Sequence, residues 1–177
     1  GLPITIANGT SRVAIFFQNI FAVGGFKSKG VELPWPYAAY LGISSLGGGI
    51  VGSLLASSMS DDLFKKIFAG IMIFSVGLIL ADPFKTNGHE KLSARDQWIG
   101  AFCFLFIGVY GGFVQAGIGF LVIGVLSLVN NLSLVKSNYA KVVAAIVYTG
   151  LSVIVFAWQD KIDWMVAGVL AVGHSLG

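Results

Sequence analysis

Charged side chains are scarce in this sequence. Asp, Glu, Lys and Arg make up 11% of its 177 residues, whereas soluble globular domains carry about a quarter. Hydrophobic residues make up 56% of the chain. This composition predicts an integral membrane protein.

The chain also lacks the residue patterns of several function classes. Cys103 is the one cysteine, so a disulfide framework or a cysteine metal site within one chain is excluded. The net charge of +3 is spread singly or in pairs, which gives no basic patch for nucleic acid. No Ser-His-Asp, metal-ligand or phosphate-loop pattern is present, and Asp61 with Asp62 reads as a solvated turn. We therefore expect no enzyme and no cofactor.

The two ends of the sequence suggest a fragment of a longer membrane domain. GLPITIANGTSR has no initiator Met and no basic region followed by an apolar one, so it does not read as a signal peptide. GVLAVGHSLG still reads as helix where the sequence stops. We expect residues 1–177 to form a single membrane transporter domain.

Apolar segments divided by short polar turns predict an all-α, polytopic helix bundle that crosses the cell membrane several times. Lys27 and Lys29 end the first segment, and Trp35 is expected at a membrane interface. His89 lies in a soluble loop. The expected helices are residues 10–26, 36–60, 63–81, 137–158 and 162 to the end, with the loop at 82–97.

The longest uncharged stretch covers residues 97–135. As one helix its 39 residues would be about 58 Å long, roughly twice the hydrocarbon thickness. Five glycines lie in its middle, with Gln115 among them. We expect a break within Tyr110–Gly119, because the stretch is too long for one helix and its glycines permit irregular backbone. Irregular backbone at membrane depth must be buried in protein or line a wet cavity.

Two alternatives concern this stretch. Gly108 and Gly112, or Gly112 and Ala116, are spaced as small residues are at close helix contacts. Such packing would explain two or three of the glycines without a solute site. The sequence also leaves open whether the chain crosses the membrane once here or returns to the side it came from.

The sequence repeats weakly at an offset of 129 residues, which places Arg12 on Lys141 and Trp35 on Trp164. Two repeated halves with glycine-broken helices are typical of secondary transporters. We expect residues 1–82 to be the remainder of a first repeat, 83–97 a hydrophilic connection, and 98–177 the start of a second. Inverted and parallel repeats both stay open.

Polar helix starts suggest where a small anion would bind, because helix N-termini offer free N–H groups and a positive dipole end. We expect such starts near residues 8–12 and 138–141, with the broken stretch opposite. The expected solute-binding residues are Asn8, Thr10, Ser11, Arg12, Gln115, Gly117, Gly119, Asn138 and Lys141, with Gln18, Asn19 and His174 as a second set. The alternative is that Arg12 and Lys141 are interfacial anchors, and Asn8 and Asn138 plain caps.

Four passages in this order resemble the TauE/SafE family of sulfite and organosulfonate exporters: GLPITIANGTSRVAIFFQN, GVYGGFVQAGIGF, SNYAKVV and KIDWMVAGVLAVGHSLG. The sequence departs from the family's glycine pattern at Phe120. The resemblance implies a secondary transporter that works in the lipid bilayer on a small sulfur-containing anion. A proton or sodium as coupling ion and a homo-oligomer stay open. The alternatives are a membrane enzyme or assembly subunit with glycine-mediated packing, and a passive channel.

Overall fold

The computed structural model describes residues 1–32, 35–81, 93–115, 117–128 and 132–176. Within these residues the chain folds into helices and forms no strand, which confirms the all-α prediction. The helices are α1 (Ile4–Ser28), α2 (Trp35–Ser58), α3 (Asp61–Ala81), α4 (Ala94–Phe113), α5 (Ile118–Leu128), α6 (Leu134–Trp158) and α7 (Trp164–Leu176). His89 and the side chain of Trp35 lie outside what the structure describes.

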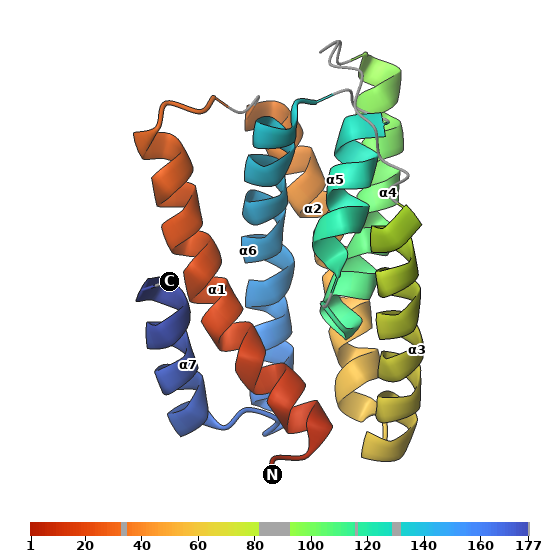
Figure 1. Ribbon diagram of the computed structural model, residues 1–177, viewed down its shortest axis with the longest axis vertical. Coiled ribbons are helices and arrows are strands. Elements are labelled where there is room, and N and C mark those ends of the chain that lie inside the picture. Colours follow the sequence, from red (N-terminus) through yellow and green to blue (C-terminus); the bar gives the residue numbers. More distant parts are fainter. Residues whose placement is uncertain (33–34, 82–92, 116, 129–131, 177) are drawn as a thin grey trace.

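The long helices run roughly along one axis of the bundle (Figure 1). Three stretches in the described part are long and apolar enough to cross a membrane: Ala39–Ser58 in α2, Arg95–Phe113 in α4 and Leu134–Trp158 in α6. The helix α1 is as long as α6 but carries several polar residues along its length. This composition matches its place beside the polar cavities described below.

The long uncharged stretch is divided between α4 and α5. The helix α4 ends at Phe113 and α5 begins at Ile118, so the non-helical residues fall inside the range expected from the sequence. Figure 1 shows that α5 turns back toward the end of the bundle where α4 begins. The chain therefore returns here instead of crossing once. That glycine itself causes the break stays a prediction.

Two helices begin earlier than expected, and this corrects the capping interpretation. The helix α1 begins at Ile4 instead of near Thr10, and α6 begins at Leu134 instead of near Ser137. Polar residues expected to cap these helices therefore lie inside them, one or more turns from the start. They are Asn8, Thr10, Ser11 and Asn138.

The glycines of α2 and α4 let these two helices meet backbone to backbone. A β-carbon at Gly52 would overlap the carbonyl oxygen of Val109, and one at Gly112 would overlap that of Gly49. A β-carbon at Gly108 would lie 2.5 Å from the carbonyl oxygen of Ser45. Gly108 and Gly112 therefore serve close helix packing, as the alternative interpretation of the sequence held.

Polar contacts fix the start of α1 against two neighbouring helices. Thr5 donates from its backbone N and its Oγ1 to the Asp61 Oδ1, at 3.2 and 2.7 Å. Thr10 Oγ1 accepts a hydrogen bond from the backbone N of Asp163 at 3.0 Å. Asp61 is therefore a structural acceptor at the start of α3, which the interpretation as a solvated turn missed.

The direction of the helices bears on the proposed repeat. In Figure 1, α2 begins at the upper end of the bundle and α7 at the lower end. Trp35 and Trp164, which the repeat places on each other, are the first residues of these two helices and therefore lie at opposite ends of the bundle. The pair α6–α7 runs opposite to α1–α2, as an inverted repeat requires, and the repeat itself stays a prediction.

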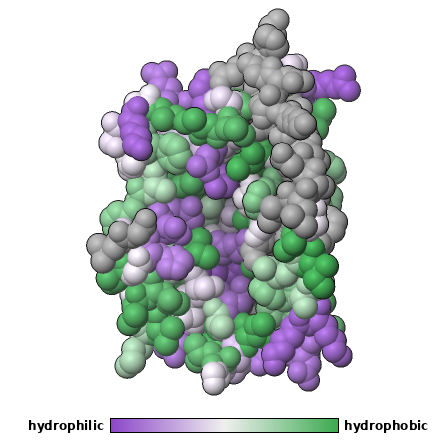
Figure 2. Space-filling model, viewed as in Figure 1, coloured by the Kyte–Doolittle hydropathy of each residue, from purple (hydrophilic) through white to green (hydrophobic). Residues whose placement is uncertain are grey.

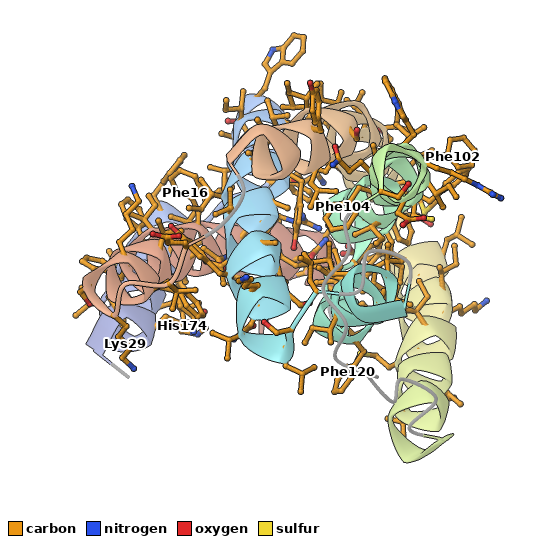
Figure 3. All side chains as sticks on the ribbon, turned by 90° about the horizontal axis from the view of Figure 1, so that it is seen from above. Phe16, Lys29, Phe102, Phe104, Phe120 and His174 are labelled. Carbon is orange, nitrogen blue, oxygen red and sulfur yellow. The ribbon has the colours of Figure 1, made fainter. Side chains whose placement is uncertain are left out.

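The aromatic residues of α4 show which side of this helix faces the bundle and which side faces outward. Phe104 is fully buried among α2, α5 and α6, whereas Phe102 is 64% exposed. Figure 3 shows Phe102 pointing away from the bundle. Exposed apolar residues of this kind, including Trp98 and Phe106, suit contact with lipid tails.

We predict that Gly112→Ala destabilises the protein by about 1 to 3 kcal/mol, the usual cost of overpacking a close contact. The added β-carbon would meet the Gly49 backbone, which cannot move without separating α2 from α4. The matched control is Gly70→Ala in α3, where a β-carbon meets nothing within 4 Å. Thermal unfolding in detergent should show a lower midpoint for Gly112→Ala alone, and equal midpoints for both variants would contradict this packing.

Candidate solute cavities at the broken helix

Arg12 binds the carbonyl end of α4. Its side chain is 0% exposed, and it donates from Nη1 to the Gly111 carbonyl at 2.9 Å and from Nη2 to the Phe113 carbonyl at 3.1 Å. The last four carbonyls of a helix have no partner within that helix. In a membrane interior such groups are costly unless a side chain satisfies them. Arg12 supplies the missing donors for two of them.

Other groups complete the surroundings of Arg12. Asn8 Nδ2 donates to the same Phe113 carbonyl at 3.1 Å, and the Arg12 guanidinium carbon lies 5.1 Å from the centre of the Phe156 ring. This distance is within the range of a cation-π contact. The burial of Arg12 and its bonds to α4 contradict the interpretation of Arg12 as an interfacial anchor. Its expected contact with a solute stays a prediction.

The residues between α4 and α5 take unusual backbone conformations. Gln115 has a φ of 66° and Gly117 a φ of 75°, both in the left-handed region that most side chains avoid. Gln115 is fixed to α6, because its Nε2 donates to Thr149 Oγ1 at 3.0 Å. Its Oε1 is buried without a hydrogen-bond partner.

A cavity of about 440 Å³ lies between α1, α5, α6 and α7, and we call it the Lys141 cavity. Lys141 lines it with the side-chain amides of Gln18, Asn19, Gln115 and Asn138. Among the described residues that line it there is no Asp or Glu. The volume suits a small ligand, and the lining offers one cation and several amide donors.

The start of α5 borders the same cavity. Gly119 lines it, and a β-carbon placed on Gly119 would lie 3.9 Å from Lys141 Nζ. The N-terminal end of α5 therefore adds the positive end of a helix dipole to the charge of Lys141. The C-terminal end of α4, which is the negative end of its dipole, is bound by Arg12. The positive charge of Arg12 reduces the repulsion between this end and an anion.

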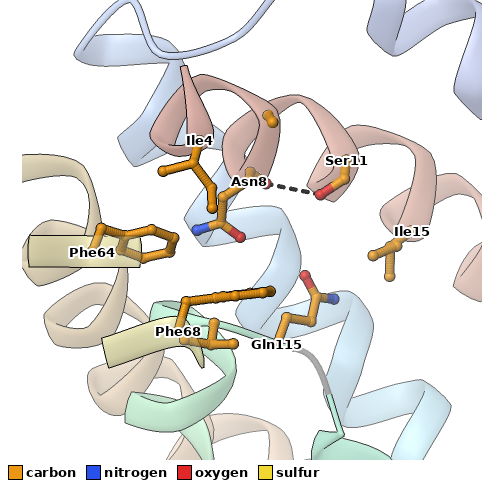
Figure 4. A pocket seen from close by; sticks show the side chains of 9 residues that line it. Ile4, Asn8, Ser11, Ile15, Phe64, Phe68 and Gln115 are labelled. Carbon is orange, nitrogen blue, oxygen red and sulfur yellow. Dashed lines mark hydrogen bonds between the residues drawn. The ribbon is translucent and has the colours of Figure 1, made fainter. Parts of the chain in front are cut away.

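A second cavity of about 310 Å³ lies between α1, α3 and the break, and we call it the Asn8 cavity. Asn8 and Ser11 line it together with Phe64 and Phe68. Figure 4 shows the Gln115 side chain directed toward α1 across this cavity. Ser11 Oγ donates to the Asn8 carbonyl at 3.0 Å, so its hydrogen is already committed within α1.

Hydrophilic side chains also gather in the middle of one face of the molecule, between flanks that are largely hydrophobic (Figure 2).

A histidine lies at the edge of the Lys141 cavity. Gln18 Oε1 on α1 and His174 Nδ1 on α7 are 3.4 Å apart there. The part of the chain that the structure describes holds no group of three His, Cys, Asp or Glu residues able to bind a metal ion.

The structure brings most of the expected site residues to one of the two cavities. Gln18, Asn19, Gln115, Gly119, Asn138, Lys141 and His174 line the Lys141 cavity, and Asn8, Ser11 and Gln115 line the Asn8 cavity. Thr10, Arg12 and Gly117 line neither.

Sequence reasoning missed several lining residues. Tyr148 lines the Lys141 cavity and Ile15 lines both cavities, while Thr149 holds Gln115. Ile15 is one of many apolar residues in α1, and nothing in the sequence distinguishes it. Thr149 could have been noticed as one of the few hydroxyl residues in its segment.

A helix bundle with a returning helix pair, polar cavities at the break and a lone cation among the described lining of one of them is consistent with a helical membrane protein and is typical of secondary transporters. The family model "Sulfite exporter TauE/SafE" matches residues 1–177. The chain therefore belongs to the TauE/SafE family of membrane transporters. Neither the search of curated proteins nor that of solved structures gives a match.

We predict that Arg12→Met lowers stability by about 1 to 3 kcal/mol, because the Gly111 carbonyl loses its donor while the Phe113 carbonyl keeps the one from Asn8. The matched control is Lys29→Met, which removes an exposed cation beyond the end of the same helix. Thermal unfolding in detergent should give a clearly lower midpoint for Arg12→Met and a nearly unchanged one for Lys29→Met. Equal stability of the two variants would show that Arg12 does not hold the end of α4.

We predict that Gly117→Leu abolishes transport while membrane insertion stays intact. A side chain at a φ of 75° costs about 1 to 2 kcal/mol, and relief of this strain would shift the start of α5. The control is Gly168→Leu in α7, where a β-carbon meets nothing within 4 Å. Uptake into vesicles with matched protein content provides the measurement, and full activity of Gly117→Leu would contradict the prediction.

Proposed function

We propose that the chain is an exporter of a small sulfur-containing anion, sulfite or an organosulfonate, and that the anion binds in the Lys141 cavity. The observation that carries the proposal is the position of Lys141 beside the start of α5, in a cavity lined by amides. An oxyanion entering this cavity would exchange water for N–H donors of side chains and backbone. We place the protein in the cell membrane as a multi-pass transporter.

The charge of the cavity favours an anion with a single negative charge. Lys141 is the one Lys or Arg among the described residues that line it. The positive end of α5 adds about half an elementary charge. The amides of Asn138 and Gln115 can donate to several oxygen atoms of one sulfite or sulfonate group without adding charge. Hydrogen sulfite and sulfonates carry this single charge. A divalent anion such as sulfate, or fully deprotonated sulfite, would carry more charge than this lining balances.

Coupling would come from a proton or sodium ion. His174, whose imidazole can carry a proton, lies at the edge of the Lys141 cavity. Its nearest polar partner is Gln18, at 3.4 Å. We keep His174 as a proposed coupling residue and assign no sodium site.

We predict that Lys141→Gln weakens the apparent affinity for the anion about ten- to a hundredfold, because one charge-assisted hydrogen bond contributes about 1.5 to 3 kcal/mol. The measurement is counterflow of sulfite in proteoliposomes, with methanesulfonate, taurine and sulfate as competitors. Lys29→Gln, an exposed cation beyond the end of α1, is the control and should leave the affinity unchanged.

The competitors and the variants together test the assignment. Methanesulfonate should compete better than sulfate in the unaltered protein, and this preference should shrink in Lys141→Gln. An unchanged affinity and an unchanged order of competitors in Lys141→Gln would show that the anion binds elsewhere. Absence of sulfite counterflow by the unaltered protein would contradict the proposed substrate itself.

A further inference from the structure

The two cavities lie one after the other along α1. The residues of this helix that line the Asn8 cavity lie between Ile4 and Ile15. Those that line the Lys141 cavity lie between Ile15 and Phe26. The distance from Ile4 to Phe26 along a helix is about 33 Å, close to the thickness of the hydrocarbon core. Because α1 runs from the lower to the upper end of the bundle (Figure 1), the cavities extend from its middle toward opposite ends.

Only Ile15 and Gln115 line both cavities among the described residues. They come from opposite sides, Ile15 from α1 and Gln115 from the break between α4 and α5. Figure 4 shows the Gln115 amide facing the part of α1 that carries Ser11 and Ile15. These two side chains therefore lie where the two cavities adjoin.

Gln115 is held at this point by the fold. Its left-handed backbone conformation, with φ at 66°, fixes the direction of the side chain, and the 3.0 Å hydrogen bond to Thr149 fixes its amide nitrogen. The buried Oε1 has no hydrogen-bond partner. A buried polar atom without a partner is costly. Because Oε1 is an acceptor, the oxygens of a passing anion cannot donate to it, so Oε1 opposes the anion at this point.

The two cavities differ in charge. The described residues that line the Asn8 cavity include no Lys, Arg, His, Asp or Glu, and two of them are the apolar Phe64 and Phe68. Lys141 gives the other cavity a cation. An anion should therefore bind more tightly in the Lys141 cavity and leave the Asn8 cavity more readily.

We propose that the Asn8 cavity is a second compartment on the path of the transported anion, and that Ile15 and Gln115 form the barrier between it and the Lys141 cavity. The two compartments open to opposite sides of the membrane. The proposal rests on the proposed function for the identity of the solute. The arrangement of the two compartments can be tested without any solute.

The first experiment measures from which side each cavity is reached. Cys103 is the one cysteine of residues 1–177, so Cys103→Ser, together with replacement of any cysteine outside this range, provides a cysteine-free background. Ala7→Cys reports on the Asn8 cavity and Ala22→Cys on the Lys141 cavity, since each residue lines its cavity. A membrane-impermeant, charged methanethiosulfonate is added to intact cells and, separately, to inverted membrane vesicles.

We expect Ala7→Cys to react from one side only and Ala22→Cys from the other side only. Ser11→Cys provides a second reporter in the Asn8 cavity. Ile20→Cys, on an exposed apolar position of the same helix, is the control and should react from neither side. Reaction of both cavity cysteines from the same side would overturn the proposal.

The second experiment enlarges the barrier. Ile15→Trp should lower the rate of sulfite counterflow at least tenfold while Ala7→Cys and Ala22→Cys keep their reactivity in the same chain. Ile20→Trp is the matched control and should transport at the unaltered rate. An unaltered rate for Ile15→Trp would overturn the assignment of the barrier. Opposite-side labelling without sulfite transport would leave the two compartments standing and contradict only the proposed substrate.

Discussion

A helix that ends inside a membrane protein leaves carbonyl oxygens that lipid cannot satisfy. Here a fully buried guanidinium, that of Arg12, binds the Gly111 and Phe113 carbonyls at the end of α4. The contact joins α1 to the break and neutralises the negative end of α4. It leaves the positive end of α5 as the exposed dipole at the Lys141 cavity. The carbonyl of Phe113 lies two residues before Gln115, so this contact also holds the start of the break against α1.

Much of the fold follows from residue spacing. The length of the uncharged stretch and its glycines placed the break in the right range, since no single helix of that length fits a bilayer. The sequence alone cannot tell which of these glycines form the break and which allow close helix packing. Gly117 has the left-handed conformation of a break, whereas Gly112 packs against the Gly49 backbone. The start of α1 at Ile4 was missed because no side chain caps it: the residue before it is Pro3, without a capping hydrogen bond.

The candidate site was predictable as a set of polar residues but not as a geometry. Lys141 and Asn138 line a cavity, whereas Arg12, the counterpart of Lys141 in the expected repeat, binds backbone carbonyls instead. A sequence shows that a cation lies in an apolar segment, but not which unpaired groups another helix presents to it. Ile15 shows the same limit for apolar residues, because its place between the cavities comes from how α1 packs on the break.

The most direct test of this account is a structure of the full-length protein with a bound anion, determined by cryo-electron microscopy in the presence of sulfite or methanesulfonate. The account predicts density for the anion in the Lys141 cavity, within hydrogen-bonding distance of Lys141 Nζ and next to the start of α5 at Gly119. The Arg12 guanidinium should still bind the carbonyl end of α4. Density for the anion against Arg12, with the end of α4 released, would contradict the account.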